Sequence, residues 1–206
     1  IVIYTSDHGF SLGHNGIWGH GAAAFPSSVH RPSYNIPLIV AGEGVAENAV
    51  NDSFVSQIDL FPTLASLVEA KDVQPSLPSS ALDLGPALRQ EGGCLRDVVF
   101  YEQEETRAIR THDWVYAMRF QGAPNYPIQN ALYHLEDDPN EKTNLSGLAE
   151  FADVETELAA QISTYFRAYS NSKYDLWNGG TAKSNVTFQA LWQDAWGNNW
   201  QPEHSA

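Results

Sequence analysis

Two runs of consecutive apolar residues, with no polar alternation, stand out in the first part of the chain: Ile1–Tyr4 and Ile36–Val40. Short runs of this kind, rich in β-branched residues, are typical of strands that are buried on both faces, as in parallel sheets. Pro37, near the start of the second run, favours a strand entry or an edge rather than the centre of a strand. The pattern therefore predicts two strands of an α/β sheet.

The next regular pattern covers Asp59–Ala70, which we interpret as a helix. Asp59 is a candidate N-cap, and Pro62 falls in the first turn, where a proline removes no needed donor. Four apolar side chains share one face of this helix: Leu60, Leu64, Leu67 and Val68.

Beyond residue 97 the pattern changes to short strands joined by turns. The predicted strands are Val98–Tyr101, Arg107–Arg110, Trp114–Phe120 and Ala131–Leu135. Asp153–Tyr169 then has the clearest helical periodicity in the chain, with Asp153 as a candidate N-cap. We expect residues 98–135 to form an antiparallel sheet with this helix packed against it.

These patterns divide the chain into three expected parts. Residues 1–96 are expected to belong to an α/β domain, and residues 97–170 to a small α+β unit of antiparallel sheet and helix. Within the first part, residues 71–96 contain three prolines and three glycines and are expected to form a surface connection. Residues 171–206, rich in Asn, Gly and Trp, are expected to be an irregular tail.

Composition and charge exclude some classes of function. The chain has 206 residues, of which 43% are hydrophobic, so a sizeable core is expected. A formal net charge of −14 argues against a nucleic-acid partner, which needs a basic surface. No apolar stretch has the length of a membrane span, and the single cysteine, Cys94, excludes an internal disulfide or a multi-cysteine zinc site.

The candidate chemistry lies in Asp7, His8 and Gly9, directly after the first predicted strand. Ligands of open α/β sheets bind beyond the carboxyl ends of the strands, so chemistry is expected at this point. Asp7 offers an oxygen ligand for a metal ion, His8 a nitrogen ligand or a proton donor, and Gly9 a sharp turn. A turn with a capping aspartate has the same sequence pattern, so the motif alone leaves both interpretations open.

Five segments, in this order, resemble the second half of a sulfatase of the alkaline-phosphatase superfamily. They are Thr5-Ser-Asp-His-Gly-Phe-Ser-Leu-Gly13, Gly16-Ile-Trp-Gly-His20, Ile36-Pro-Leu-Ile-Val40, Ile58-Asp-Leu-Phe-Pro-Thr63 and Leu132-Tyr-His-Leu-Glu-Asp-Asp-Pro-Asn-Glu-Lys-Thr-Asn-Leu145. The last one resembles the C-terminal signature of that family very closely. The resemblance implies an alkaline-phosphatase-like α/β fold, with a partial parallel sheet in residues 1–96, followed by the small α+β unit.

The same resemblance implies a formylglycine-dependent hydrolase of sulfate esters, acting on an aryl sulfate, another sulfated small molecule or a sulfated polysaccharide. Asp7 matches a carboxylate ligand of the family's Ca²⁺ ion, with Mg²⁺ or Zn²⁺ less favoured, and His8 matches the neighbouring ligand that also faces the sulfate. His20 falls where many members place a Lys or His that binds a sulfate oxygen. His8 and His20 are therefore the expected catalytic and substrate-binding residues.

The sequence departs from the family pattern at two points. Asn15 stands where the family often has a histidine, and Cys94 is not part of the formylglycine maturation motif. The chain also begins within an apparent core strand, which we interpret as a cut, so the absence of a targeting segment carries no weight. The nucleophile and the other metal ligands are expected in a missing N-terminal half of the same protein, and the location is expected to be periplasmic or extracellular.

Two alternatives remain open. A metal-dependent phosphodiesterase or phosphonate hydrolase of the same superfamily also uses an Asp-His-Gly motif, with zinc as its metal. A non-catalytic fragment that binds a carbohydrate is the second alternative. The upstream sequence would separate these interpretations, because a Cys/Ser-x-Pro-x-Arg motif indicates a sulfatase.

Overall fold

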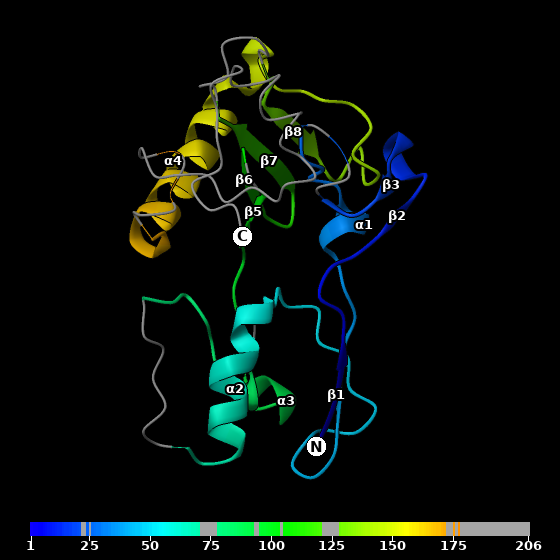
Figure 1. The fold of residues 1–206 in the computed structure, drawn as a ribbon, viewed down its shortest axis with the longest axis vertical. Helices are drawn as coiled ribbons and strands as arrows, with labels where there is room; N and C mark the ends of the chain where they lie inside the picture. The colour runs from blue at the N-terminus through cyan, green and yellow to red at the C-terminus, as the bar shows by residue number, and fades with distance from the viewer. Residues whose placement is uncertain are drawn as a thin grey trace, which may run out of the picture.

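The computed structural model describes residues 1–21, 24, 26–70, 78–92, 95–103, 105–120, 128–171, 175 and 177 (Figure 1). Its strands are β1 (Val2–Thr5), β2 (Ser11–Leu12), β3 (Trp18–Gly19), β4 (Leu38–Ala41), β5 (Val99–Gln103), β6 (Thr106–Arg110), β7 (Trp114–Arg119) and β8 (Ala131–His134). Its α-helices are α1 (Arg31–Tyr34), α2 (Leu60–Leu67), α3 (Gly85–Leu88) and α4 (Ala152–Tyr169). Short 3₁₀ turns lie at η1 (His14–Gly16), η3 (Gln57–Asp59) and η4 (Ala149–Phe151).

The predicted antiparallel sheet and its helix are confirmed. Strands β5, β6, β7 and β8 pair in that order, each antiparallel to its neighbour. Helix α4 covers one face of this sheet, and six buried side chains form the core between them: Ile109, Tyr116, Leu132, Leu158, Ile162 and Phe166. Because every third or fourth residue of α4 meets this core, the helical periodicity of the sequence was a reliable signal.

The opposite face of the same sheet is covered by the first part of the chain. Val29 is buried there against alternate residues of the strands, among them Ala108, Val115 and Ala117. Figure 1 shows α4 on one side of the sheet and α1, β2 and β3 on the other. Residues from both sides of the predicted boundary at 96/97 therefore share one core.

Strands β1 and β4 were expected in a parallel sheet, and this detail is wrong. They pair antiparallel, with Val2 opposite Ala41 and Thr5 opposite Leu38. The chain leaves β1 at its upper end in Figure 1 and re-enters the pair at β4 from that same end, whereas parallel pairing would require a crossover to the other end. The sulfatase-like α/β fold class does not depend on this pairing.

The two strands are also not buried on both faces. Their residues alternate between exposed and half-buried, and Val2 and Tyr4 are 71% and 62% exposed. Ile39 on β4 is exposed as well. One apolar face of this strand pair is therefore open to solvent.

Helix α2 differs from its prediction in what it buries. Leu64 and Val68, on the predicted apolar face, are exposed, and the one buried residue is Thr63. Asp59 does not cap the helix by a simple N-cap bond. Its carboxylate accepts the backbone N–H of Ser56 in a capping box, and it also accepts the backbone N–H of Leu82 at 2.8 Å.

Two further details concern the helix termini and the tail. Asp153 lies within the first turn of α4, and the N-cap position is Phe151, so the predicted cap is displaced by two residues. Of the predicted tail, only Asn171, Asp175 and Trp177 are among the described residues, and the rest lies outside them.

The described residues contain no helix that is long and apolar enough to span a membrane.

The core between α4 and the sheet predicts a clear contrast between two substitutions on one helix. Leu158 is 4% exposed, so Leu158→Ala should lower the free energy of unfolding by about 2–5 kcal/mol, through lost burial and a residual cavity. Thr164→Ala, at an exposed position of α4, should change it by less than about 0.5 kcal/mol. Urea titration of both variants measures this difference, and equal effects would contradict the packing described here.

Candidate active site

Asp7 and His8 lie together at the C-terminal end of β1, as the sequence predicts. The Asp7 carboxylate is 3.6 Å from His8 Nε2 and accepts the backbone N–H of His8 at 2.9 Å. That backbone bond, followed by the charge of the imidazole, lowers the pKa of Asp7 below its usual value. Both side chains are open to solvent, 84% for Asp7 and 47% for His8, so both are accessible to a ligand.

His20 lies beside His8. The centroids of the two imidazole rings are 4.5 Å apart, although twelve residues separate them in sequence. A small hairpin brings them together, because β2 and β3 pair antiparallel with Ser11 opposite Gly19. Gly13 and Gly16 adopt positive φ in the turn of this hairpin, which is the backbone region that glycine enters without strain.

Both histidine loops are bonded to the segment Ser27–Tyr34, which we call the strap. The backbone N–H of Gly9, next to His8, donates to the carbonyl of Ser33 at 3.0 Å. The carbonyl of Gly21, next to His20, accepts the N–H of Ser28 at 2.8 Å. A glycine is needed at position 9, because a Cβ there would lie 2.1 Å from the carbonyl oxygen of Pro32.

The strap is in turn held by two buried glutamates of the second half of the chain. The first is Glu141, whose side chain is 2% exposed. It accepts the Arg31 backbone N–H at 3.0 Å and an Arg110 guanidinium N–H at 2.6 Å, and its Oε2 lies 3.1 Å from His30 Nδ1. Burial alone would raise the pKa of Glu141, but the bonds from His30 and Arg110 outweigh burial and lower it.

The second buried carboxylate is Glu105. It accepts the backbone N–H of Ser27 at 2.6 Å and the Ser27 hydroxyl at 3.2 Å. Arg119 lies 3.6 Å from Glu105 and donates to the carbonyl of Ser27 at 2.6 Å. Burial lowers the pKa of Arg119, while the Glu105 charge opposes that effect.

Sequence reasoning did not identify these glutamates as part of the site. Glu141 lies in an Asp-Asp-Pro-Asn-Glu run, a pattern that favours an interpretation as turn and capping chemistry. That interpretation is correct for Asp138, whose carboxylate accepts the N–H groups of Lys142 and Thr143. The turn pattern gives no sign that Glu141 faces a segment 110 residues upstream.

A cavity lined by described residues lies elsewhere, between the strap and the sheet. Among the residues lining it are Ser28, His30, Arg119 and Tyr133, and none of Asp7, His8 and His20 lines it. The three candidate site residues therefore lie outside this cavity.

The donor set near β1 is incomplete for a metal ion. In the part of the chain that the structure describes, no group of three or more His, Cys, Asp and Glu side chains could hold one. Asp7 offers carboxylate oxygens of the kind that Ca²⁺ prefers, whereas His8 Nε2 suits an anion contact or a softer metal better. The residues present thus fit one edge of a calcium site.

The comparisons with known proteins agree with the resemblance seen in the sequence. Residues 1–70 match the family model for sulfatases. Bovine (Bos taurus) arylsulfatase K is 27% identical over 95% of this chain and 38% of its own length, and YidJ, a sulfatase of Escherichia coli (strain K12), is 30% identical over 82% of this chain and 34% of its own. The chain thus spans little more than a third of the curated relatives it matches.

Solved structures share the fold. The phosphonate monoester hydrolase of Agrobacterium radiobacter superposes with a TM-score of 0.67 at 22% identity, covering 89% of this chain and 37% of its own. A protein solved with its substrate D-glucosamine-2-N,6-O-disulfate superposes with a TM-score of 0.64 at 22% identity, covering 81% of this chain and 34% of its own.

Together these findings confirm the resemblance to sulfatases, at their C-terminal portion. They also confirm the sulfatase-like α/β fold class.

The close approach at Gly9 gives a test of how the His8 loop is held. Gly9→Ala should destabilise the protein by about 1–3 kcal/mol, because a backbone carbonyl cannot rotate away from the added methyl group. Gly92→Ala is the matched control, since a Cβ there meets nothing within 4 Å. Thermal unfolding of both variants measures the contrast, and a neutral Gly9→Ala would refute the strap contact.

The lowered pKa of Glu141 gives a pH-dependent prediction. A carboxyl group whose pKa is lower in the folded state contributes stability above its unfolded pKa of about 4.3, and loses it as the pH falls through the folded pKa. The wild-type protein should therefore exceed Glu141→Gln in stability by roughly 3 kcal/mol at pH 5.5, and by much less near pH 3. Denaturant titrations across this range measure the difference, and a constant difference would contradict the assignment.

Proposed function

We propose that this chain is the C-terminal portion of a sulfuric ester hydrolase, in which Asp7, His8 and His20 contribute to the sulfate site. The observation that carries the proposal is the meeting of these three residues at the end of β1, within the region that matches the sulfatase family. The relatives and the shared fold support the reaction class. The activity of the whole protein is part of the proposal.

The two histidines would bind the sulfate group. His8 Nδ1 lies 2.8 Å from the carbonyl of Gly9, which favours a proton on that nitrogen. His20 presents a second imidazole 4.5 Å from the first. In the imidazolium form both nitrogens of a ring carry a proton, so the two side chains would then donate N–H groups to negative charge that develops on sulfate oxygens during hydrolysis.

Asp7 would serve as a metal ligand. Its pKa is lowered and its side chain faces solvent, so it is an available anionic oxygen donor at neutral pH. A bound Ca²⁺ ion would supply positive charge close to the sulfate oxygens. The formylglycine nucleophile and the remaining ligands would come from sequence outside these 206 residues.

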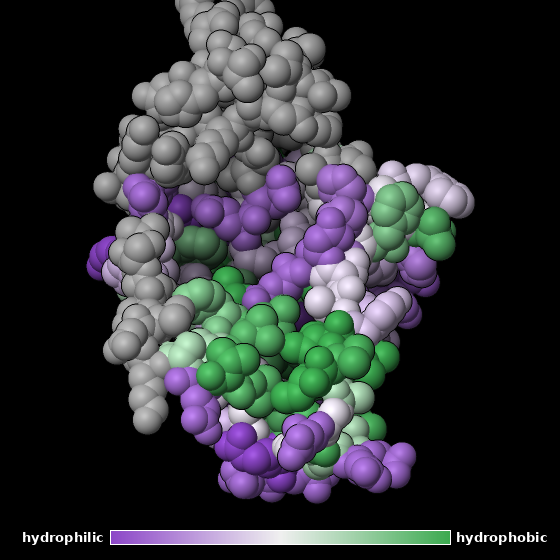
Figure 2. All heavy atoms as spheres, turned by 60° about the horizontal axis from the view of Figure 1, so that its bottom comes forward, coloured by the Kyte–Doolittle hydropathy of each residue, from purple (hydrophilic) through white to green (hydrophobic). Residues whose placement is uncertain are grey.

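The exposed apolar face of β1, β4 and α2 supports a larger assembly. Figure 2 shows apolar side chains gathered on the lower part of the molecule. The exposed apolar residues of this region include Val2, Tyr4, Ile39, Leu64 and Val68. A face of this kind is unusual for a monomeric surface, and we infer that the rest of the sulfatase fold covers it.

The proposed substrates are aryl sulfates or sulfated carbohydrates. A relative named arylsulfatase K and a neighbour solved with a disulfated glucosamine support these two classes. A phosphonate monoester hydrolase is the second candidate, because an enzyme of that name shares the fold.

The test is hydrolysis of 4-nitrophenyl sulfate by the longer protein that carries this chain, matured to formylglycine and supplied with Ca²⁺. Asp7→Ala should abolish turnover, and His8→Ala or His20→Ala should lower kcat by about 10²–10³-fold. His112→Ala, in the turn between β6 and β7, is the matched histidine control and should keep full activity.

Two outcomes would overturn parts of this proposal. Hydrolysis of a phosphonate monoester without hydrolysis of the sulfate would favour the second candidate. Rapid release of sulfate by residues 1–206 alone would show that the site does not need further sequence.

A further inference from the structure

The positions of His8 and His20 depend on the strap, because each histidine precedes a glycine that is bonded to it. Gly9 donates to Ser33 and Gly21 accepts from Ser28, so the two bonds lie at opposite ends of the strap. Tyr34 adds a third contact. A Cβ at Gly21 would lie 2.8 Å from the Tyr34 hydroxyl oxygen, so that hydroxyl packs directly against the His20 loop.

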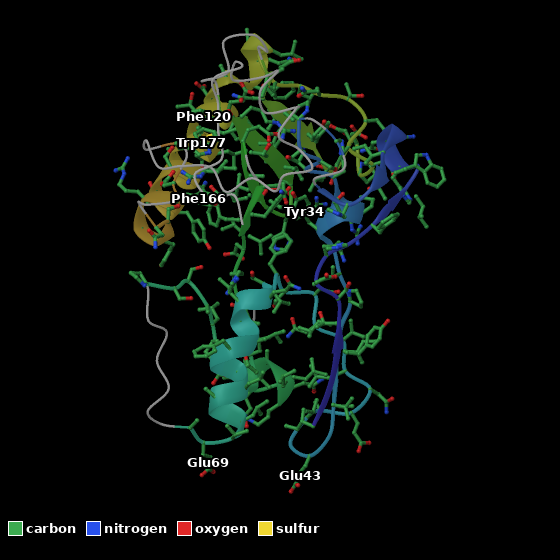
Figure 3. All side chains as sticks on the ribbon, in the orientation of Figure 1. Tyr34, Glu43, Glu69, Phe120, Phe166 and Trp177 are labelled. Carbon is green, nitrogen blue, oxygen red and sulfur yellow. The ribbon has the colours of Figure 1, made fainter. Side chains whose placement is uncertain are left out.

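Tyr34 is itself fixed against the antiparallel sheet. Its ring lies 4.3 Å from the ring of Tyr101 on β5, and Figure 3 shows it between α1 and the sheet. Burial raises the pKa of Tyr34 to about 12, so the hydroxyl stays neutral at physiological pH. The C-terminal end of the strap is therefore held by aromatic packing.

The middle of the strap is held by Glu141, which also reaches the hairpin that carries His20. Its carboxylate bonds the backbone of Arg31 and the side chain of His30, both on the strap. Its backbone carbonyl accepts the side-chain amide of Asn15, in the turn between β2 and β3, at 3.3 Å. One residue of the C-terminal turn thus contacts both segments that place the two histidines.

We propose that Glu141 is a positioning residue for the sulfate site: it fixes the strap relative to the β2–β3 hairpin and so sets the distance between His8 and His20. This inference rests on the proposed function for its effect on catalysis. Its structural part, the coupling of Glu141 to the two histidine loops, does not depend on that function. Glu105 holds the strap at Ser27 but has no described contact with the hairpin, so Glu141 is the sharper test.

The experiment uses the longer protein that carries this chain, with Glu141→Gln. The amide group keeps the shape of the side chain but offers a single acceptor oxygen to three donors. Hydrogen exchange at the backbone amides of Gly9 and Ser28 should become about tenfold faster. On 4-nitrophenyl sulfate, kcat/KM should fall about tenfold at a temperature well below unfolding.

Asp138→Asn is the matched control. It makes the same carboxylate-to-amide change in the same turn, but Asp138 bonds only the turn residues Lys142 and Thr143 through its side chain. This variant should leave both exchange rates and kcat/KM unchanged. If Glu141→Gln does not fold, His30→Ala removes one strap contact and leaves the pair of Glu141 with Arg110 intact, and it should shift the same readouts in the same direction.

A double variant separates positioning from a general loss of stability. If Glu141 acts through the histidine loops, adding Glu141→Gln to His20→Ala should lower kcat/KM by much less than the tenfold seen in the wild-type background. Full additivity would overturn the proposal, and so would unchanged exchange at Gly9 and Ser28. Faster exchange in a protein that releases no sulfate would support the positioning role and refute the proposed function, so the two failures are distinguishable.

Discussion

Two buried carboxylates, Glu105 and Glu141, join the first half of the chain to the antiparallel sheet of the second half. A carboxylate removed from water is strongly destabilising unless donors surround it, and a buried pair that loses one partner leaves an uncompensated charge. Each of these glutamates takes donors from the strap and also has an arginine from the sheet nearby, Arg119 or Arg110. Displacing the strap would leave both charges buried with fewer donors, so the strap and the sheet are energetically coupled.

This coupling gives the C-terminal sheet a role in the candidate site that its distance from His8 in sequence does not suggest. The sheet fixes the glutamates, the glutamates fix the strap, and the strap bonds Gly9 and Gly21. Each step is a hydrogen bond or an ion pair with at least one buried partner, and such contacts define position better than the exposed side chains of Asp7 and His8 would alone. Residues from the second half of the chain are thus part of the support of the site.

The sequence predicted the elements that depend on local periodicity. It failed where a contact with residues distant in the chain determines the structure. The sheet β5–β8 and helix α4 satisfy their hydrophobic pattern against each other, so the pattern alone located them. The direction of β1 against β4 depends on the path of the intervening residues, and the exposed face of α2 depends on what covers it. Glu141 was interpreted as a turn residue because no local signal indicates a bond to Arg31, 110 residues away. Asp7 and His8 were located correctly because a motif at a strand end is local.

The exposed apolar residues of β1 and the proposed metal ligand Asp7 lie close together in the chain. Asp7 lies at the end of β1, a strand whose residues Val2 and Tyr4 are exposed, and the described residues near it offer one carboxylate and the two imidazoles of His8 and His20. A calcium ion takes about six to eight oxygen ligands, so most of its shell would have to come from elsewhere. The strap is bonded to Gly9, whereas the side chain of Asp7 is 84% exposed, so further ligands can approach Asp7 from the solvent side. Because Asp7 follows β1 closely, a segment that covers the exposed residues of this strand would lie next to the proposed metal site.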